Sequence, residues 1–197
     1  MNSEPGNRSR TVAGLVLAAG FSHRFGGDKR CARLGSGQTL LGASLALPCA
    51  LLEEVWLVLR PEDDSAALGV PTQVQVVRSD CAELGMGHSL ASGMQAICQL
   101  TKANSVAIFL GDMPWIDADS LSYLLALASP EHMVVPTFQG QPGHPVIFGR
   151  RFWPALQKLT GDAGAKSVLQ AHPQAVRRLP LNDPGILRDI DTPLLIE

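Results

Sequence analysis

"VLAAGFSHRFGGDK", residues 16–29, decides the fold, because it joins an apolar run to a loop of glycines and cations. The apolar run at 11–18 predicts a strand that is buried on both faces. Glycines in the loop let the backbone approach a ligand and expose its N–H groups. Arg24 offers a planar guanidinium for phosphate, and Lys29 offers a compact charge. This order predicts a polyphosphate-binding loop, against the alternative of a surface loop with incidental charges.

Two common phosphate-binding motifs do not explain this loop. A Walker A sequence needs G-x-x-x-x-G-K-[ST], but here Lys29 follows Asp28 and precedes Arg30. The dinucleotide motif G-x-G-x-x-G fails at 85–90, "GMGHSL", because Leu90 stands in place of the third glycine. The loop therefore needs another explanation.

Apolar runs rich in β-branched residues alternate with helical patterns along the rest of the chain. We expect helices at 39–50, 89–100, 117–128 and 164–172, and further strands at 54–60, 73–77, 105–110 and 175–181. Between 132 and 149, two apolar runs flank "QGQPG", which predicts a hairpin or an excursion. Continuous apolar strands separated by helices predict an α/β fold with a parallel sheet covered on both faces.

The composition is typical of a compact protein. The chain has 197 residues, 46% of them apolar and 17% charged, and its net charge of −2 does not indicate nucleic-acid binding. We expect a flexible tail at 1–10 and one domain at 11–197. The sequence shows no signal peptide, no membrane span and no metal-binding spacing among its four cysteines. We therefore expect a cytoplasmic monomer with free thiols and no membrane partner.

A carboxylate that suits a metal ion follows the predicted strand at 105–110. Asp112 lies in "FLGDMPW", and Mg²⁺ is usually bound by carboxylates together with phosphate oxygens. In a 3-2-1-4 strand order, Asp112 and the loop at 16–29 face each other across the crevice. A turn aspartate or a helix N-cap is the alternative. Asp191, in "DIDTP", fits a second metal ligand or a helix cap equally well.

Six segments, taken together and in this order, resemble a known family. They are "LAAGFSHRFGGDK", "GMGHSLASG", "LGDMPWI", "GQPGHPVIF", "GDAGAKSVL" and "DIDTP", and they span about residues 12–193. The set is similar to the molybdenum cofactor nucleotidyltransferases of the MobA-like NTP transferase family, and most similar to their cytidylyl-transferring branch. Only the first segment is strong by itself, whereas the whole set is highly specific.

The resemblance implies a Rossmann-like three-layer α/β/α sandwich of the nucleotide-diphospho-sugar transferase type, with a mostly parallel sheet. It implies a nucleotidyltransferase that uses Mg²⁺ to transfer CMP from CTP to the terminal phosphate of molybdopterin, releasing pyrophosphate. Some relatives are tied to the maturation of molybdenum hydroxylases, so an apo molybdenum hydroxylase is an expected partner.

The resemblance also assigns roles to particular residues. The catalytic residues are Arg24, Lys29 and Asp112: the two cations hold the triphosphate, and Asp112 binds magnesium. Asp191 is the candidate for a second metal ligand. The nucleotide further contacts the backbone of Leu17, Ala18, Ala19 and Gly20, and its base and ribose lie near Gly85, Met86 and Ser89. The acceptor side is lined by Gly143, His144 and Lys166. From the residues alone, His144 fits a structural turn about as well, and Ser89 equally fits a helix N-cap.

The choice of substrates remains open at this stage. Ala19 favours CTP, since the guanylyl-transferring branch typically has L-A-G-G in place of L-A-A-G. The run after Lys29, "RCARLGSG", replaces an apolar pair that is common in relatives, and Lys166 replaces a frequent arginine. There are three alternatives. The protein uses GTP, it acts on another phosphorylated acceptor, or it is a non-catalytic chaperone for the cofactor. The presence of both cations together with Asp112 argues against the chaperone.

Overall fold

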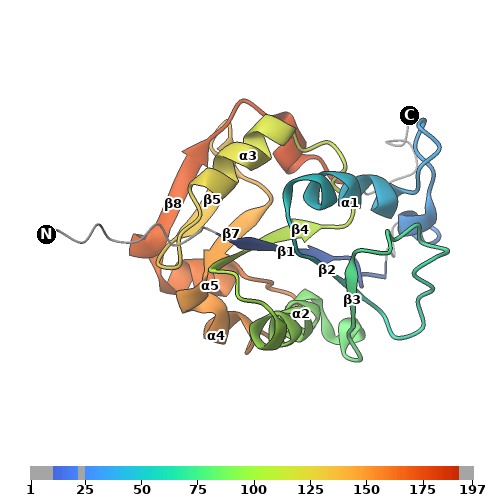
Figure 1. Ribbon diagram of the computed structural model, residues 1–197, viewed down its shortest axis with the longest axis horizontal. Coiled ribbons are helices and arrows are strands. Elements are labelled where there is room, and N and C mark those ends of the chain that lie inside the picture. The colour runs from blue at the N-terminus through green and yellow to red at the C-terminus, as the bar shows by residue number, and fades with distance from the viewer. Residues whose placement is uncertain (1–10, 22–24, 191–197) are drawn as a thin grey trace, which may run out of the picture.

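The computed structural model describes residues 11–21 and 25–190, which are built around an eight-stranded sheet (Figure 1). The strands lie in the order β3-β2-β1-β4-β7-β5-β6, and β8 pairs with β5. The predicted strands are found with ends within two residues of those expected. The bounds are β1 Val12–Leu17, β2 Val55–Leu59, β3 Gln75–Arg78, β4 Ser105–Leu110, β5 Met133–Phe138, β6 Gln141–Pro142, β7 Val146–Gly149 and β8 Val176–Pro180.

The first four strands of the sheet are parallel, and their order confirms the predicted 3-2-1-4 arrangement. β1 pairs with β2 on one side and with β4 on the other, and β2 pairs with β3. Leu17 and Leu110 are register partners at the carboxyl ends of β1 and β4. The loops that follow these two strands therefore leave the sheet side by side.

The segment at 132–149 forms a hairpin and then returns to the sheet. β5 and β6 are joined by Gln139 and Gly140, whose φ angles of 50° and 81° are those of a tight hairpin turn. The chain then enters the sheet as β7, antiparallel to both β4 and β5. This insertion makes the sheet mixed.

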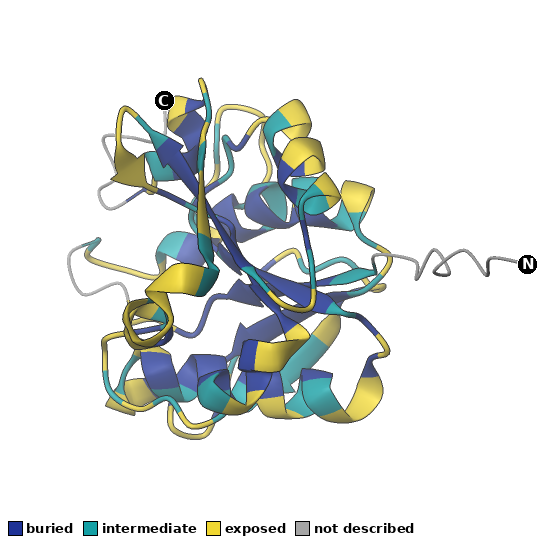
Figure 2. Cartoon of the chain, turned by 90° about the vertical axis from the view of Figure 1, so that its left-hand side faces the viewer, coloured by how far each residue is buried: buried dark blue, intermediate teal, exposed yellow. Residues whose placement is uncertain are grey.

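Helices cover both faces of the sheet, which confirms the three-layer expectation (Figures 1 and 2). One core cluster packs α1 and α3 against the strands and includes Val16, and the other packs α2, α4 and α5 and includes Leu15. Neighbouring residues of β1 thus face opposite layers. The helices are α1 Leu40–Leu51, α2 Met86–Leu100, α3 Ala118–Ala126, α4 Trp153–Leu156 and α5 Lys166–Ala171. Within the described ranges, none has the length and apolar character needed to cross a membrane.

α1 and α3 begin within one residue of the predicted starts, whereas α5 begins two residues late, α2 begins early, and α4 was not predicted. Thr39 caps α1 by accepting a hydrogen bond from Gly42 N, and Asp117 caps α3 in the same way. α2 begins at Met86, three residues before the expected start, so the alternative that Ser89 is a helix N-cap is wrong. Gly85, with a φ of 114°, takes the N-cap position and turns the chain directly into the helix.

Candidate active site

Lys29 and Asp112 meet beyond the carboxyl ends of β1 and β4. Lys29 begins a short 3₁₀-helix, η1 (Lys29–Cys31), and Asp112 follows β4 by two residues. Lys29 Nζ donates a 2.7 Å hydrogen bond to Asp112 Oδ2, and the two side chains are 16% and 19% exposed. The structure therefore brings together the two halves of the predicted site at the edge where open α/β sheets bind ligands.

The chain just before residue 191 closes this edge of the site. Ile190 N donates to Asp112 O at 3.1 Å, and Ile190 O accepts from Lys29 Nζ at 3.0 Å. Asp191 and Arg24, like the tail at 1–10, lie outside the described residues. Their predicted roles stay predictions.

A cavity of about 360 Å³ opens beside the Lys29–Asp112 pair, and we call it the nucleotide cavity. It is lined by each described residue that the sequence analysis assigned to the nucleotide: Leu17, Ala18, Ala19, Gly20, Lys29, Gly85, Met86 and Ser89. Phe21, Arg30, Glu83 and Asp162 also line it, which the sequence analysis did not predict. Two segments that are distant in the sequence, the loop after β1 and the start of α2, thus line one cavity.

A second cavity of about 660 Å³, here called the acceptor cavity, adjoins the first. It is lined by the three residues predicted for the acceptor side, Gly143, His144 and Lys166. Leu17, Met86 and Leu110 line both cavities, so these residues mark the boundary between them. Apolar side chains make most of the remaining wall, together with Arg178.

The glycines of "GMGHS" are explained by a close approach of the backbone. Gly87 N donates a 2.7 Å hydrogen bond to Gly161 O, so the segment 160–162 lies against the first turn of α2. A Cβ on Gly87 would lie 2.6 Å from Thr160 O, and one on Gly85 would collide with Gly161 and Asp162. Because these two residues have no side chain, the loop before α5 can pack directly against this wall of the nucleotide cavity.

His144 is a largely buried side chain at the acceptor cavity. Burial lowers its pKa, while a backbone hydrogen bond at Ile108 and the charges of Asp112 and Asp189 partly oppose this shift. Its Nδ1 is buried without a hydrogen-bond partner among the described residues. The backbone of His144 is also fixed, because its N–H donates to Ile186 O at 2.9 Å. Both a structural role and a ligand-binding role thus remain compatible with its position.

The site fits a divalent cation that is bound by a carboxylate of the protein and by phosphate oxygens of a substrate. Asp112 Oδ1 is buried and has no hydrogen-bond partner among the described residues, as expected for an oxygen that a metal ion would occupy. No group of three or more His, Cys, Asp or Glu side chains in the described ranges has the geometry of a metal cage. Mg²⁺ commonly binds through one or two carboxylates plus substrate phosphates, and Asp112 meets that description.

Three polar residues around the loop were missed by the sequence analysis, namely Arg30, Arg60 and Asp63. The sequence carries only a weak signal for them: Arg30 departs from the apolar pair common in relatives, and Arg60 directly follows a strand. Arg30 is only 3% exposed, and it is paired with Asp28 and Asp63. Buried arginines of this kind are paired because an isolated charge is costly to desolvate.

The fold and the two cavities define a class, an α/β protein with two adjoining cavities beyond the carboxyl ends of β1 and β4. The family described as "MobA-like NTP transferase domain" matches residues 14–176, and the chain belongs to this nucleotidyltransferase family. The resemblance to the MobA-like NTP transferase family is thereby confirmed.

Individual relatives match over nearly their whole length. The chain is 34% identical to "Purine catabolism protein PucB" of Bacillus subtilis (strain 168), over 94% of each chain. It is 27% identical to "Nicotine blue oxidoreductase" of Paenarthrobacter nicotinovorans, over 92% of each. A crystal structure from Mycobacterium sp. strain JC1, described as a homologue of Rv0371c of Mycobacterium tuberculosis, has a TM-score of 0.79 and 32% identity, covering 92% of this chain and 90% of that one.

Proposed function

We propose that this protein transfers CMP from CTP to the terminal phosphate of molybdopterin and releases pyrophosphate. One observation carries the proposal: the Lys29–Asp112 pair lies at the nucleotide cavity, which adjoins the larger acceptor cavity. A triphosphate in the first cavity and a phosphate entering from the second would meet at their boundary.

The reaction joins two anions in line. An oxygen of the acceptor phosphate forms a bond to the α-phosphorus of the nucleotide, and the bond from that phosphorus to the bridging oxygen breaks as pyrophosphate leaves. The acceptor is a phosphate monoester that is already ionised near neutral pH, so a strong general base is not needed. Positioning and charge neutralisation therefore carry the catalysis.

The residues of the chain divide this task. Lys29, held at the cavity wall by η1, offsets charge on the phosphates, and the backbone N–H groups of Ala19 and Gly20 donate to phosphate oxygens. Asp112 holds Mg²⁺, which when bound supplies further positive charge for the phosphates. Arg24, outside the described residues, is proposed to share the role of Lys29.

Two features support the particular substrates. The acceptor cavity combines mostly apolar walls with His144, Lys166 and Arg178, which suits an aromatic heterocycle that carries a phosphate. Ala19 in the L-A-A-G segment favours the cytidylyl-transferring branch of the family. We further propose that the protein acts as a cytoplasmic monomer and that an apo molybdenum hydroxylase receives the product.

The decisive experiment measures pyrophosphate release with Mg²⁺, molybdopterin, and CTP, GTP, ATP or UTP in turn. Release with CTP alone is the expected result. Release with GTP alone would show that the protein transfers a guanylyl group. Release that occurs with CTP and another phosphorylated acceptor, but not with CTP and molybdopterin, would show that molybdopterin is not the acceptor. Nucleotide binding without any pyrophosphate release would contradict an enzyme and favour a chaperone for the cofactor. An Asp112→Ala variant serves as the control for release that does not come from this site.

A further inference from the structure

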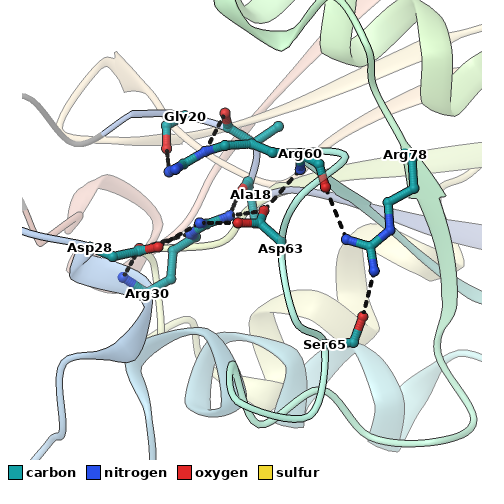
Figure 3. Close-up of polar contacts among 9 residues, drawn as sticks. Ala18, Gly20, Asp28, Arg30, Arg60, Asp63, Ser65 and Arg78 are labelled. Carbon is teal, nitrogen blue, oxygen red and sulfur yellow. Dashed lines mark hydrogen bonds and ion pairs between the residues drawn. The ribbon is translucent and has the colours of Figure 1, made fainter.

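Every N–H group of the Arg30 guanidinium is already bonded within the protein (Figure 3). Two bonds go to the carboxylate of Asp28, two go to that of Asp63, and the fifth goes to the carbonyl oxygen of Ala18 at 2.7 Å. A guanidinium has only five N–H donors. Although Arg30 lines the nucleotide cavity, it has no donor left for a phosphate, so any role it has must act through the residues that it holds.

Arg60 holds the next two carbonyl groups of the same loop. It follows β2 directly, and its guanidinium donates to Ala19 O at 3.4 Å and to Gly20 O at 2.6 Å. The guanidinium carbon also lies 4.4 Å from the centre of the Phe21 ring. Arg60 therefore contacts three successive residues of the loop after β1.

Asp63 links the two arginines. Its carboxylate accepts two hydrogen bonds from Arg30 and a third, of 2.9 Å, from the backbone N–H of Arg60. Its side chain is only 7% exposed, so these bonds are shielded from water and are stronger than surface contacts. Figure 3 shows the guanidinium group of Arg60 beside Gly20 and that of Arg30 beside Ala18 and Asp63.

The result is an asymmetric loop backbone. The carbonyl oxygens of Ala18, Ala19 and Gly20 are all bonded to arginines, whereas the N–H groups of Ala19 and Gly20 donate to no partner among the described residues. All three residues line the nucleotide cavity. Unpaired backbone N–H groups are good donors to anions, and carbonyl oxygens facing the same anion would repel it.

We propose that Arg30 and Arg60 are positioning residues that shape the loop after β1 for a triphosphate, by holding its carbonyl groups so that the N–H groups of Ala19 and Gly20 remain available. The same network fixes Asp28 and Arg30, the two neighbours of Lys29, and so also places the Lys29 side chain. This inference rests on the proposed function, because it assigns these residues to nucleotide binding.

Arg60→Met is the sharpest test, since Arg60 is partly exposed and its loss leaves no buried carboxylate without its charge partner. We expect the KM for the Mg²⁺–nucleotide complex to rise about tenfold, as for the loss of a charged hydrogen bond, with a smaller change in kcat. Arg60→Lys keeps one donor group and should restore part of the loss. Arg78→Met is the matched control, because Arg78 donates to Arg60 O and to Ser65 Oγ but to none of the three loop carbonyls.

A second readout needs no nucleotide. In the ligand-free protein, the amide resonances of Ala19 and Gly20 should shift in Arg60→Met and stay in place in Arg78→Met, with similar unfolding temperatures for both. Unshifted resonances in Arg60→Met would overturn the inference but not the proposed function. An unchanged KM in Arg60→Met, when the unaltered protein does bind nucleotide, would have the same meaning. Failure of the unaltered protein to bind any Mg²⁺–nucleotide would instead overturn the proposed function, and the inference with it.

Discussion

Lys29 Nζ and Asp112 Oδ2 lie 2.7 Å apart, although the two residues are 83 positions apart in the chain. The pair joins the loop after β1 to the loop after β4. Each partner offsets the charge of the other, so both are held at the cavity wall before any ligand binds.

We predict that Lys29→Ala and Asp112→Ala fold normally but lose turnover by a factor on the order of 10²–10³, as for a lost charge-stabilising group. Each variant also leaves a largely buried charge without its partner, so stability must be measured beside turnover. Pyrophosphate release and thermal unfolding of each variant test this. Turnover close to that of the unaltered protein would remove that residue from the mechanism.

Gly87→Ala should destabilise the protein by about 1–3 kcal/mol, as overpacking typically does. The added methyl would lie 2.6 Å from Thr160 O and 2.8 Å from Gly161 O, and backbone atoms cannot turn aside. Gly35→Ala is the control, since a Cβ there meets nothing within 4 Å. Urea unfolding of both variants measures the difference, and equal stabilities would contradict the close approach.

Asp28 and Asp63 should make the loop sensitive to acid. Hydrogen bonds from Arg30 lower the pKa of Asp28, whereas burial raises the pKa of Asp63 but is outweighed by hydrogen bonds from Arg30. Because both folded-state pKa values lie below the ordinary 3.8, their contribution to the free energy of unfolding is present above pH 3.8 and is lost as the pH falls further.

Urea unfolding across this acidic range tests the prediction. Asp63→Asn should lower stability at neutral pH and flatten the acid dependence. Asp64→Asn is the matched control, because Asp64 bonds to the backbone of Ala66 and does not contact Arg30. An identical acid response in the two variants would show that the carboxylates around Arg30 do not cause it.

His144→Asn should raise the KM for the acceptor about tenfold while leaving the KM for the nucleotide unchanged, because His144 lines the acceptor cavity only. Burial lowers the pKa of His144 below its ordinary value of 6.5. Any change in acceptor binding that protonation of this ring causes should therefore be centred below pH 6.5. Steady-state kinetics with each substrate varied in turn provide the measurement, and equal effects on both KM values would indicate a structural role.

Most of the fold was predictable because its signals are local. Strand limits followed from apolar runs, and Thr39 marked the start of α1. The early start of α2 was not predictable in the same way, since it depends on the positive φ of Gly85 and on contact between the first turn of α2 and the distant segment 160–162. The position of β7 depends likewise on pairing with distant strands.

The sequence predicted the residues that meet at the candidate site, but not the arginines that hold the loop after β1. Lys29 and Asp112 stand out because each follows a buried strand, and parallel strands bring such positions together. Arg30 gave no comparable signal, because its partners Ala18 and Asp63 lie 12 and 33 positions away. A cation next to a candidate phosphate-binding lysine suggests a second phosphate ligand. The hydrogen bonds show instead that all five N–H donors of Arg30 are used inside the protein.

The hydrogen bonds of Ile190 have a consequence for the order in which the protein matures. Ile190 contacts both Lys29 and Asp112 through its backbone, so the edge of the site is closed by a residue that the ribosome adds long after the other two. Domains begin to fold during synthesis, and the first strands can pair before the last part of the chain emerges. A nascent chain that ends before residue 190 would thus hold an incomplete site, and competence for nucleotide chemistry would arise only late in translation.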